Sequence, residues 1–84
     1  MKKIEGTISI GKANAHYYAI RLRQRREQLK LSQRKLAELS GIKQPMIARI
    51  EKCKSIPKLD TFIRLAMALD YCFDFIDLKE KNNE

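Results

Sequence analysis

The residues of this sequence with the clearest chemistry are arginines. Four of them, Arg21, Arg23, Arg25 and Arg26, fall within six positions, and Glu27 alone offsets them nearby. A guanidinium is planar, permanently charged and matched to phosphate oxygens, so the cluster favours contact with a phosphate-bearing partner. The alternative is a solvated basic face on the surface of the protein.

The distribution of charge supports the phosphate-binding interpretation. Residues 1–64 hold 16 Lys and Arg and 5 Asp and Glu, a net charge of +11, whereas residues 65–84 hold 2 and 5, a net charge of −3. A positive field over most of the chain favours a polyanionic partner, and the acidic end favours a different contact.

Other chemistries find little support in the sequence. The two cysteines, Cys53 and Cys72, and the single histidine, His16, are too few for a disulfide framework or a zinc site. Because the chain also lacks a glycine-rich phosphate loop and paired carboxylates, we expect no enzyme, catalytic residue, metal or cofactor. No apolar run approaches the ~20 residues of a membrane span, and the basic N-terminus lacks the apolar core of a signal peptide. We therefore expect a cytoplasmic protein with reduced thiols and no membrane contact.

One stretch, QRKLAELSGIKQPMIARIE, organises the chain. Its apolar residues keep helical spacing on both sides of Gly41, a residue type that adopts positive φ in a tight turn without steric cost. Ser32 is a suitable N-cap for the first of the two helices. The pattern predicts short helices over about residues 32–39 and 44–52 that meet in a compact corner. The corner residues are Leu36, Ala37, Gly41, Ile42, Ile47 and Ile50.

Two further helices and an aromatic tail flank this corner. We expect a first helix from about Asn14, a suitable cap, to Leu29, and a fourth helix over about residues 59–69. Before the first helix, the alternation in residues 7–10 indicates a short strand, with disorder as the alternative. The tail DYCFDFIDL favours a strand over residues 71–78, although a fifth helix also fits its spacing, and the last residues look disordered.

The segments LSQRKLA, SGI and KQPMIARIE resemble the helix-turn-helix of the Cro and cI repressor class, the XRE family of bacterial regulators. The likeness extends outward on both sides and covers about residues 20–70. It implies a mainly α fold, a compact four- to five-helix domain like that of the lambda repressor, here with a short C-terminal β-strand. The expected organisation is an N-terminal arm over residues 1–13, a helix-turn-helix domain over 14–70, and a dimerisation strand with a disordered tail over 71–84.

The resemblance also implies how such a corner meets DNA. In this family the first helix of the corner lies across the DNA backbone, and the second enters the major groove. Gln33 matches a glutamine that contacts phosphate and braces the reading helix, and Gln44 matches one whose amide pairs with N6 and N7 of adenine. Arg49 is expected to reach a guanine or a phosphate. The residues expected to contact DNA are Arg26, Gln33, Arg34, Lys43, Gln44, Pro45, Met46, Arg49, Lys52 and Lys54.

Three positions depart from the family pattern. Relatives commonly have Ser where Lys43 stands. Pro45 follows Gln44, and because proline disfavours α geometry in the residue before it, Gln44 becomes a candidate for the helix cap. The reading end would then shift by about one residue. Relatives commonly have glycine where Cys53 stands, so the turn into Lys54 is expected to differ.

The resemblance implies a sequence-specific transcriptional regulator that binds double-stranded DNA as a homodimer, a repressor of a palindromic operator. Phe73, Phe75 and Ile76 are expected to support the dimer through pairing of the tail strand with its copy. The tail also resembles small antitoxins of the HigA and HipB type. The alternative is therefore an antitoxin that represses its own operon and binds a small toxin protein. A third hypothesis, a protein-interaction module on a degenerate helix-turn-helix, is disfavoured by the charge.

Overall fold

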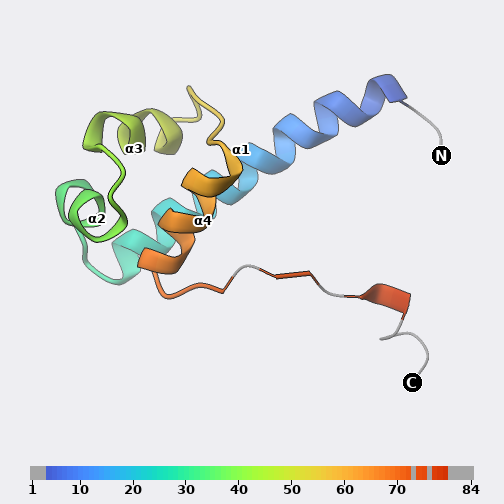
Figure 1. Cartoon of the computed structure of the whole chain (residues 1–84). Coiled ribbons are helices and arrows are strands. Elements are labelled where there is room, and N and C mark those ends of the chain that lie inside the picture. Colours follow the sequence, from blue (N-terminus) through green and yellow to red (C-terminus); the bar gives the residue numbers. More distant parts are fainter. Residues whose placement is uncertain (1–3, 73, 76, 80–84) are drawn as a thin grey trace.

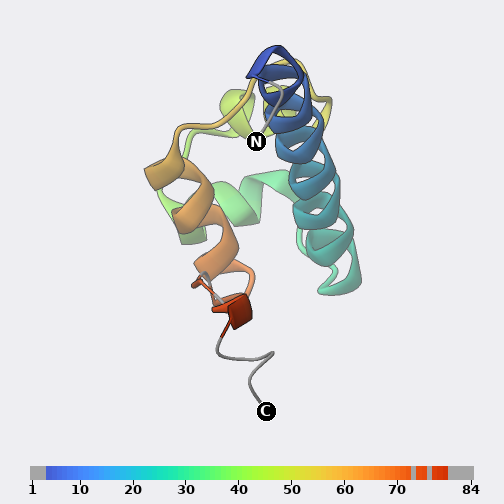
Figure 2. The same ribbon diagram turned by 90° about the vertical axis from the view of Figure 1, so that its right-hand side faces the viewer.

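The computed structural model describes residues 4–72, 74–75 and 77–79, with side chains described from Ala13 onward. This part of the chain contains four helices. They are α1 (Ile4–Gln28), α2 (Gln33–Ser40), α3 (Gln44–Glu51) and α4 (Leu59–Ala68) (Figure 1). The helix α2 packs against both α3 and α4, and α1 packs against α3. Figure 2 shows α1 and α4 as the two long sides of the molecule, with α2 and α3 behind them. The expected mainly α fold is confirmed.

The core draws apolar residues from all four helices. Fully burying one leucine or isoleucine contributes about 1.5 to 3 kcal/mol, so a core of this size supports a small domain. The corner that the sequence predicts lies at its centre, because Leu36, Ile47 and Ile50 are each almost fully buried. The buried apolar residues are Ala19, Leu22, Leu36, Ile47, Ile50, Leu65, Ala66 and Leu69.

The helix α1 is longer than the sequence predicts. It begins at Ile4, so the expected cap at Asn14 and the expected strand over residues 7–10 are both wrong. No proline interrupts this stretch, and once the packed second half of α1 is helical, each further residue adds a hydrogen bond without a new nucleation step. The first turns of α1 consequently project away from the other three helices (Figure 1).

Local signals set the ends of α2. The Ser32 side chain accepts a hydrogen bond from the backbone N–H of Lys35 at 2.9 Å, as expected of an N-cap. Gly41 ends the helix with φ of +78°, and its N–H donates to the carbonyl of Ala37 at 2.9 Å. A β-carbon at Gly41 would meet no backbone, its nearest neighbour being the tip of Arg64 at 3.9 Å, so the left-handed φ is what favours glycine here.

Three other turns contain a residue other than glycine with a positive φ. Lys30, Cys53 and Asp70 have φ of 60°, 60° and 65°. Cys53 thus adopts the backbone conformation that favours glycine, and the expectation that its turn differs from that of relatives stays a prediction. A left-handed conformation costs a non-glycine residue roughly 1 to 2 kcal/mol. Cys53 is half-buried and Cys72 is exposed, and both are free cysteines.

The tail follows α4 in close contact with α1. Arg25 donates from Nε to the carbonyl of Leu69 at 2.9 Å, and its guanidinium lies 4.9 Å from the centre of the Tyr71 ring. This contact ties the C-terminal end of α4 to α1. Of the tail residues that the structure describes beyond Tyr71, none belongs to a strand. Pairing with a second copy stays a prediction, and its residues Phe73 and Ile76 lie outside the described part.

Candidate nucleic-acid interface

The helix α3 begins at Gln44, and the residue before it is its cap. Lys43 is extended, with φ of −67° and ψ of 141°, and its carbonyl accepts the first helical hydrogen bonds, from Met46 at 3.0 Å and Ile47 at 3.2 Å. Gln44 is therefore a residue of the first helical turn, and the alternative that it caps the helix is wrong. Pro45 is tolerated because N–H groups of the first turn have no partner within the helix.

A buried carboxylate connects this helix to the rest of the domain. Glu51, in the last turn of α3, is 7% exposed and accepts two hydrogen bonds from Arg26, at 2.7 Å to Oε2 and 2.9 Å to Oε1. Arg26 also donates from Nη1 to the carbonyl of Leu31 at 2.7 Å. The hydrogen bond to Glu51 raises the pKa of Arg26, so the guanidinium stays charged.

The Arg26 side chain is largely turned inward, with 12% of its surface exposed. We expect it at the DNA backbone, but its guanidinium points into the molecule, where three of its N–H groups already have partners. A buried carboxylate needs such a partner, because an unpaired buried charge is strongly destabilising. The ion pair joins α3 to α1, and contact of Arg26 with the DNA backbone stays a prediction.

Two glutamines link Glu51 to the surface of the protein through hydrogen bonds. Gln33, the first residue of α2, donates from Nε2 to Glu51 Oε1 at 3.0 Å. Gln44 in turn donates from Nε2 to Gln33 Oε1 at 3.5 Å on the exposed surface. The half-buried Gln33 is thus oriented by the core, and it lies against the exposed amide at the start of α3. The resemblance implies that Gln33 braces the reading helix, and this role stays a prediction.

The remaining predicted contacts lie on the outside of the molecule. Arg49 donates from Nε to the Ser55 hydroxyl at 2.9 Å and from Nη2 to the Lys54 carbonyl at 3.5 Å, which directs it along the loop after α3. No salt bridge is recorded within the described residues for the exposed bases of this group. The exposed members are Arg34, Lys43, Gln44, Pro45, Met46, Arg49, Lys52 and Lys54.

Sequence reasoning missed Glu51 and Ser55. Glu51 is four positions after the buried Ile47, which places it toward the interior and is the one signal that could have found it. The contact of Ser55 with Arg49 could be found only in the structure, where Arg49 donates to the Ser55 hydroxyl. Within the part of the chain that the structure describes, no group of His, Cys, Asp or Glu is placed to hold a metal ion. Nor is any helix found there that is long and apolar enough to cross a membrane.

Comparison with known proteins identifies the family of this chain. Residues 22–76 match the family described as helix-turn-helix. The chain belongs to the XRE-type helix-turn-helix family. One relative, from Haemophilus influenzae, is named as an uncharacterized HTH-type transcriptional regulator and is 47% identical over 57 residues, which are 68% of this chain and 58% of the relative. The chain thus spans a little over half the length of that relative. No solved structure was found to match it.

Proposed function

We propose that this chain is a sequence-specific, double-stranded DNA-binding transcriptional regulator, a dimeric repressor of a palindromic operator. The observation that carries the proposal is the connected set Arg26, Glu51, Gln33 and Gln44. It joins a buried ion pair to an exposed amide in the first turn of α3. A side chain that reads a base binds more specifically when contacts within the protein hold it in place, because it then loses less conformational freedom on binding.

In the proposed complex, α3 enters the major groove with its N-terminal turn toward the bases. The Gln44 amide pairs with N6 and N7 of adenine, a bidentate contact that discriminates by about 1 to 3 kcal/mol. Gln33 contacts phosphate and positions Gln44, and Pro45 and Met46 offer apolar surface to the groove. Arg49 reaches a guanine or a phosphate from the far end of α3. The phosphate contacts assigned by this proposal are Arg34, Lys43, Lys52 and Lys54.

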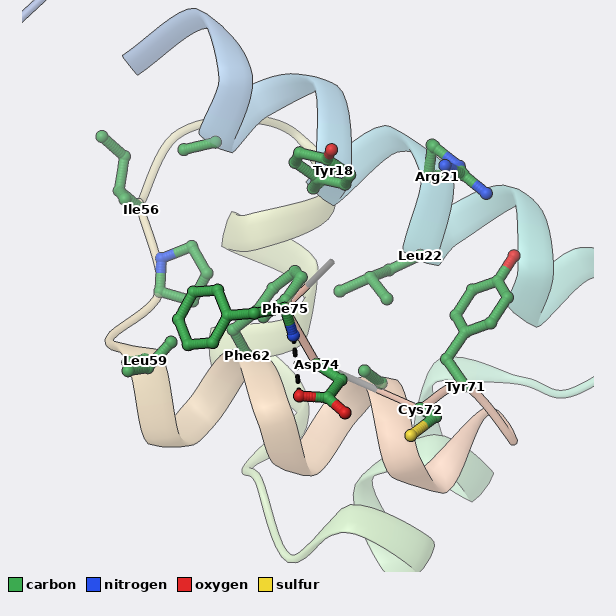
Figure 3. Close-up of a pocket in the computed structure, with 13 residues that line it drawn as sticks. Tyr18, Arg21, Leu22, Ile56, Leu59, Phe62, Tyr71, Cys72, Asp74 and Phe75 are labelled. Atoms are coloured by element: carbon green, nitrogen blue, oxygen red, sulfur yellow. Dashed lines mark hydrogen bonds between the residues drawn. The ribbon is translucent and has the colours of Figure 1, made fainter. Parts of the chain in front are cut away.

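An antitoxin remains the second candidate, and a specific observation favours it. Phe75 in the tail is 90% exposed and lines a mainly apolar groove with Tyr18 and Phe62 (Figure 3), and exposed apolar patches mark surfaces that bind other proteins. A small toxin protein would be the partner, and repression of a shared operon would use the same α3 contacts. A toxin gene adjacent to this one would distinguish this function from that of a simple repressor. The cytoplasmic location is a prediction under either function.

The salt dependence of duplex binding tests the proposal. With about 6 phosphate contacts per dimer, affinity should fall roughly 10³-fold between 50 and 200 mM salt, because each contact releases condensed counterions. Fluorescence anisotropy with a labelled duplex measures this directly. An affinity that does not change with salt would exclude a DNA-binding role for the basic surface.

A further inference from the structure

The helix α3 ends in a turn that brings the following loop back beside its last residues. Cys53 has a left-handed backbone with φ of 60°. Its N–H donates to the carbonyl of Ile50 at 3.0 Å. The N–H of Lys54 donates to the carbonyl of Arg49 at 2.8 Å. These two hydrogen bonds make a Schellman motif, which closes the helix and turns the chain. Ser55, the next residue, consequently lies beside the Arg49 side chain.

The loop holds one edge of the Arg49 guanidinium. Nε donates to the Ser55 hydroxyl at 2.9 Å, and Nη2 donates to the carbonyl of Lys54 at 3.5 Å. Ser55 is half-buried whereas Arg49 is exposed, so the hydroxyl is the fixed partner of the pair. A guanidinium has five N–H groups in one plane, and N–H groups on Nη1 and Nη2 stay available. Their parallel arrangement matches two oxygens of a phosphate.

The direction in which Arg49 is held favours the DNA backbone over the bases. In the proposed complex, the N-terminal turn of α3 faces the bases. Both partners of the Arg49 side chain follow the C-terminal end of α3, so the guanidinium is directed away from that turn. Side chains of a helix normally lean toward its N-terminus. The orientation of Arg49 therefore depends on its contacts with the loop.

The charge of the loop also favours a phosphate. Residues 52–58 contain three exposed lysines, Lys52, Lys54 and Lys58, and no Asp or Glu. The preceding acid, Glu51, is buried in its pair with Arg26 and does not face this loop. A segment with this charge attracts the charged phosphates of DNA more strongly than the neutral edges of its bases.

We propose that Ser55 is a positioning residue, which holds Arg49 so that its outer N–H groups contact a phosphate beside the groove that α3 enters. The inference rests on the proposed function and decides between the two contacts that it allows for Arg49. In this arrangement Arg49 contributes affinity for any duplex, because a phosphate contact carries no base information. Base selection is left to the first turn of α3, which includes Gln44.

Variants of Ser55 and Arg49, alone and together, test the positioning role. Ser55→Ala should weaken duplex binding roughly 2- to 10-fold per chain, because an arginine that nothing holds loses more conformational freedom on binding. In an Arg49→Ala background the same change should have no further effect. In a Lys52→Ala background, the matched control, its effect should persist. Ser55→Thr keeps the hydroxyl and should restore the affinity of the wild type.

Arg49→Ala by itself tests the assignment to phosphate. It should weaken binding to all duplexes about evenly and reduce the slope of log affinity against log salt by about 1 per chain. The motif selected from random duplexes should stay that of the wild type. A motif relaxed at one base pair would show that Arg49 reads a guanine and would overturn the inference. So would equal effects of Ser55→Ala in the Arg49→Ala and Lys52→Ala backgrounds.

The free protein separates this inference from the proposed function. In ¹⁵N NMR spectra the Nε–H of Arg49 should exchange with water more slowly than that of Arg34, for which no hydrogen bond is recorded among the described residues. Ser55→Ala should abolish the difference. Equal exchange in the wild type would overturn the inference alone, whatever duplex the protein binds. Slow exchange at Arg49 in a protein that binds no duplex would refute the proposed function, and the phosphate contact with it.

Discussion

Arg26 and Glu51, 25 positions apart in the sequence, form a doubly hydrogen-bonded ion pair with N–O distances of 2.7 and 2.9 Å. The side chains are 12% and 6% exposed, so the pair lies largely out of water. It joins α1 to the last turn of α3, and through Gln33 it also reaches the first turn of α2. The orientation of the proposed reading helix therefore depends on an ion pair inside the domain.

Removing the carboxylate should destabilise the domain strongly. Glu51→Ala leaves the Arg26 guanidinium buried without its partner, and the free energy of unfolding should fall by about 3 to 5 kcal/mol. Urea denaturation measures the loss. Glu27→Ala is the control, because Glu27 pairs with Arg23 at 3.2 Å on the exposed surface, where a pair contributes about 0 to 1 kcal/mol. Similar losses in both variants would contradict a structural role for Glu51.

The two glutamines should affect DNA binding differently. Gln44→Ala should cost about 1 to 3 kcal/mol on the preferred duplex and relax the preference at one base position. Gln33→Ala removes the proposed phosphate contact and the hydrogen bond to Gln44, so it should weaken binding to many sequences more evenly. Selection from random duplexes with each variant, followed by titration, distinguishes the two effects. If the Gln44 variant selects the wild-type motif at the wild-type affinity, Gln44 does not read a base.

The left-handed turn after α3 should be stabilised by glycine. Cys53 has φ of 60°, and Cys53→Gly removes the steric cost of that conformation. Cys53→Ala removes the same thiol but keeps a β-carbon. The difference in the free energy of unfolding between the two variants therefore measures the cost of the left-handed backbone at this position. The glycine variant should be about 1 kcal/mol more stable than the alanine variant in thermal or urea unfolding. Equal stabilities would show that the turn relaxes without strain.

The helix-turn-helix corner could be predicted because its determinants are local. Ser32 and Gly41 act within one turn of the residues they cap. Leu36 follows the helical spacing of α2, and Ile47 and Ile50 follow that of α3. Their positions in the structure are those that the sequence indicates.

The features that the sequence did not predict depend on contacts between distant residues. The ion pair of Arg26 involves Glu51, which no local pattern pairs with it. The start of α1 was misplaced because Asn14 is a good cap by type, whereas the helix simply continues through it.

The central claim is that the exposed side of α3 recognises a DNA sequence, and one measurement tests it most directly. Duplexes are selected from a random pool, and the affinity of the selected duplex is compared with that of a scrambled duplex of equal length at one salt concentration. We predict binding to the selected duplex that is roughly 10³-fold tighter or more, with two half-sites related by two-fold symmetry. Equal affinity for the two duplexes would contradict sequence-specific recognition.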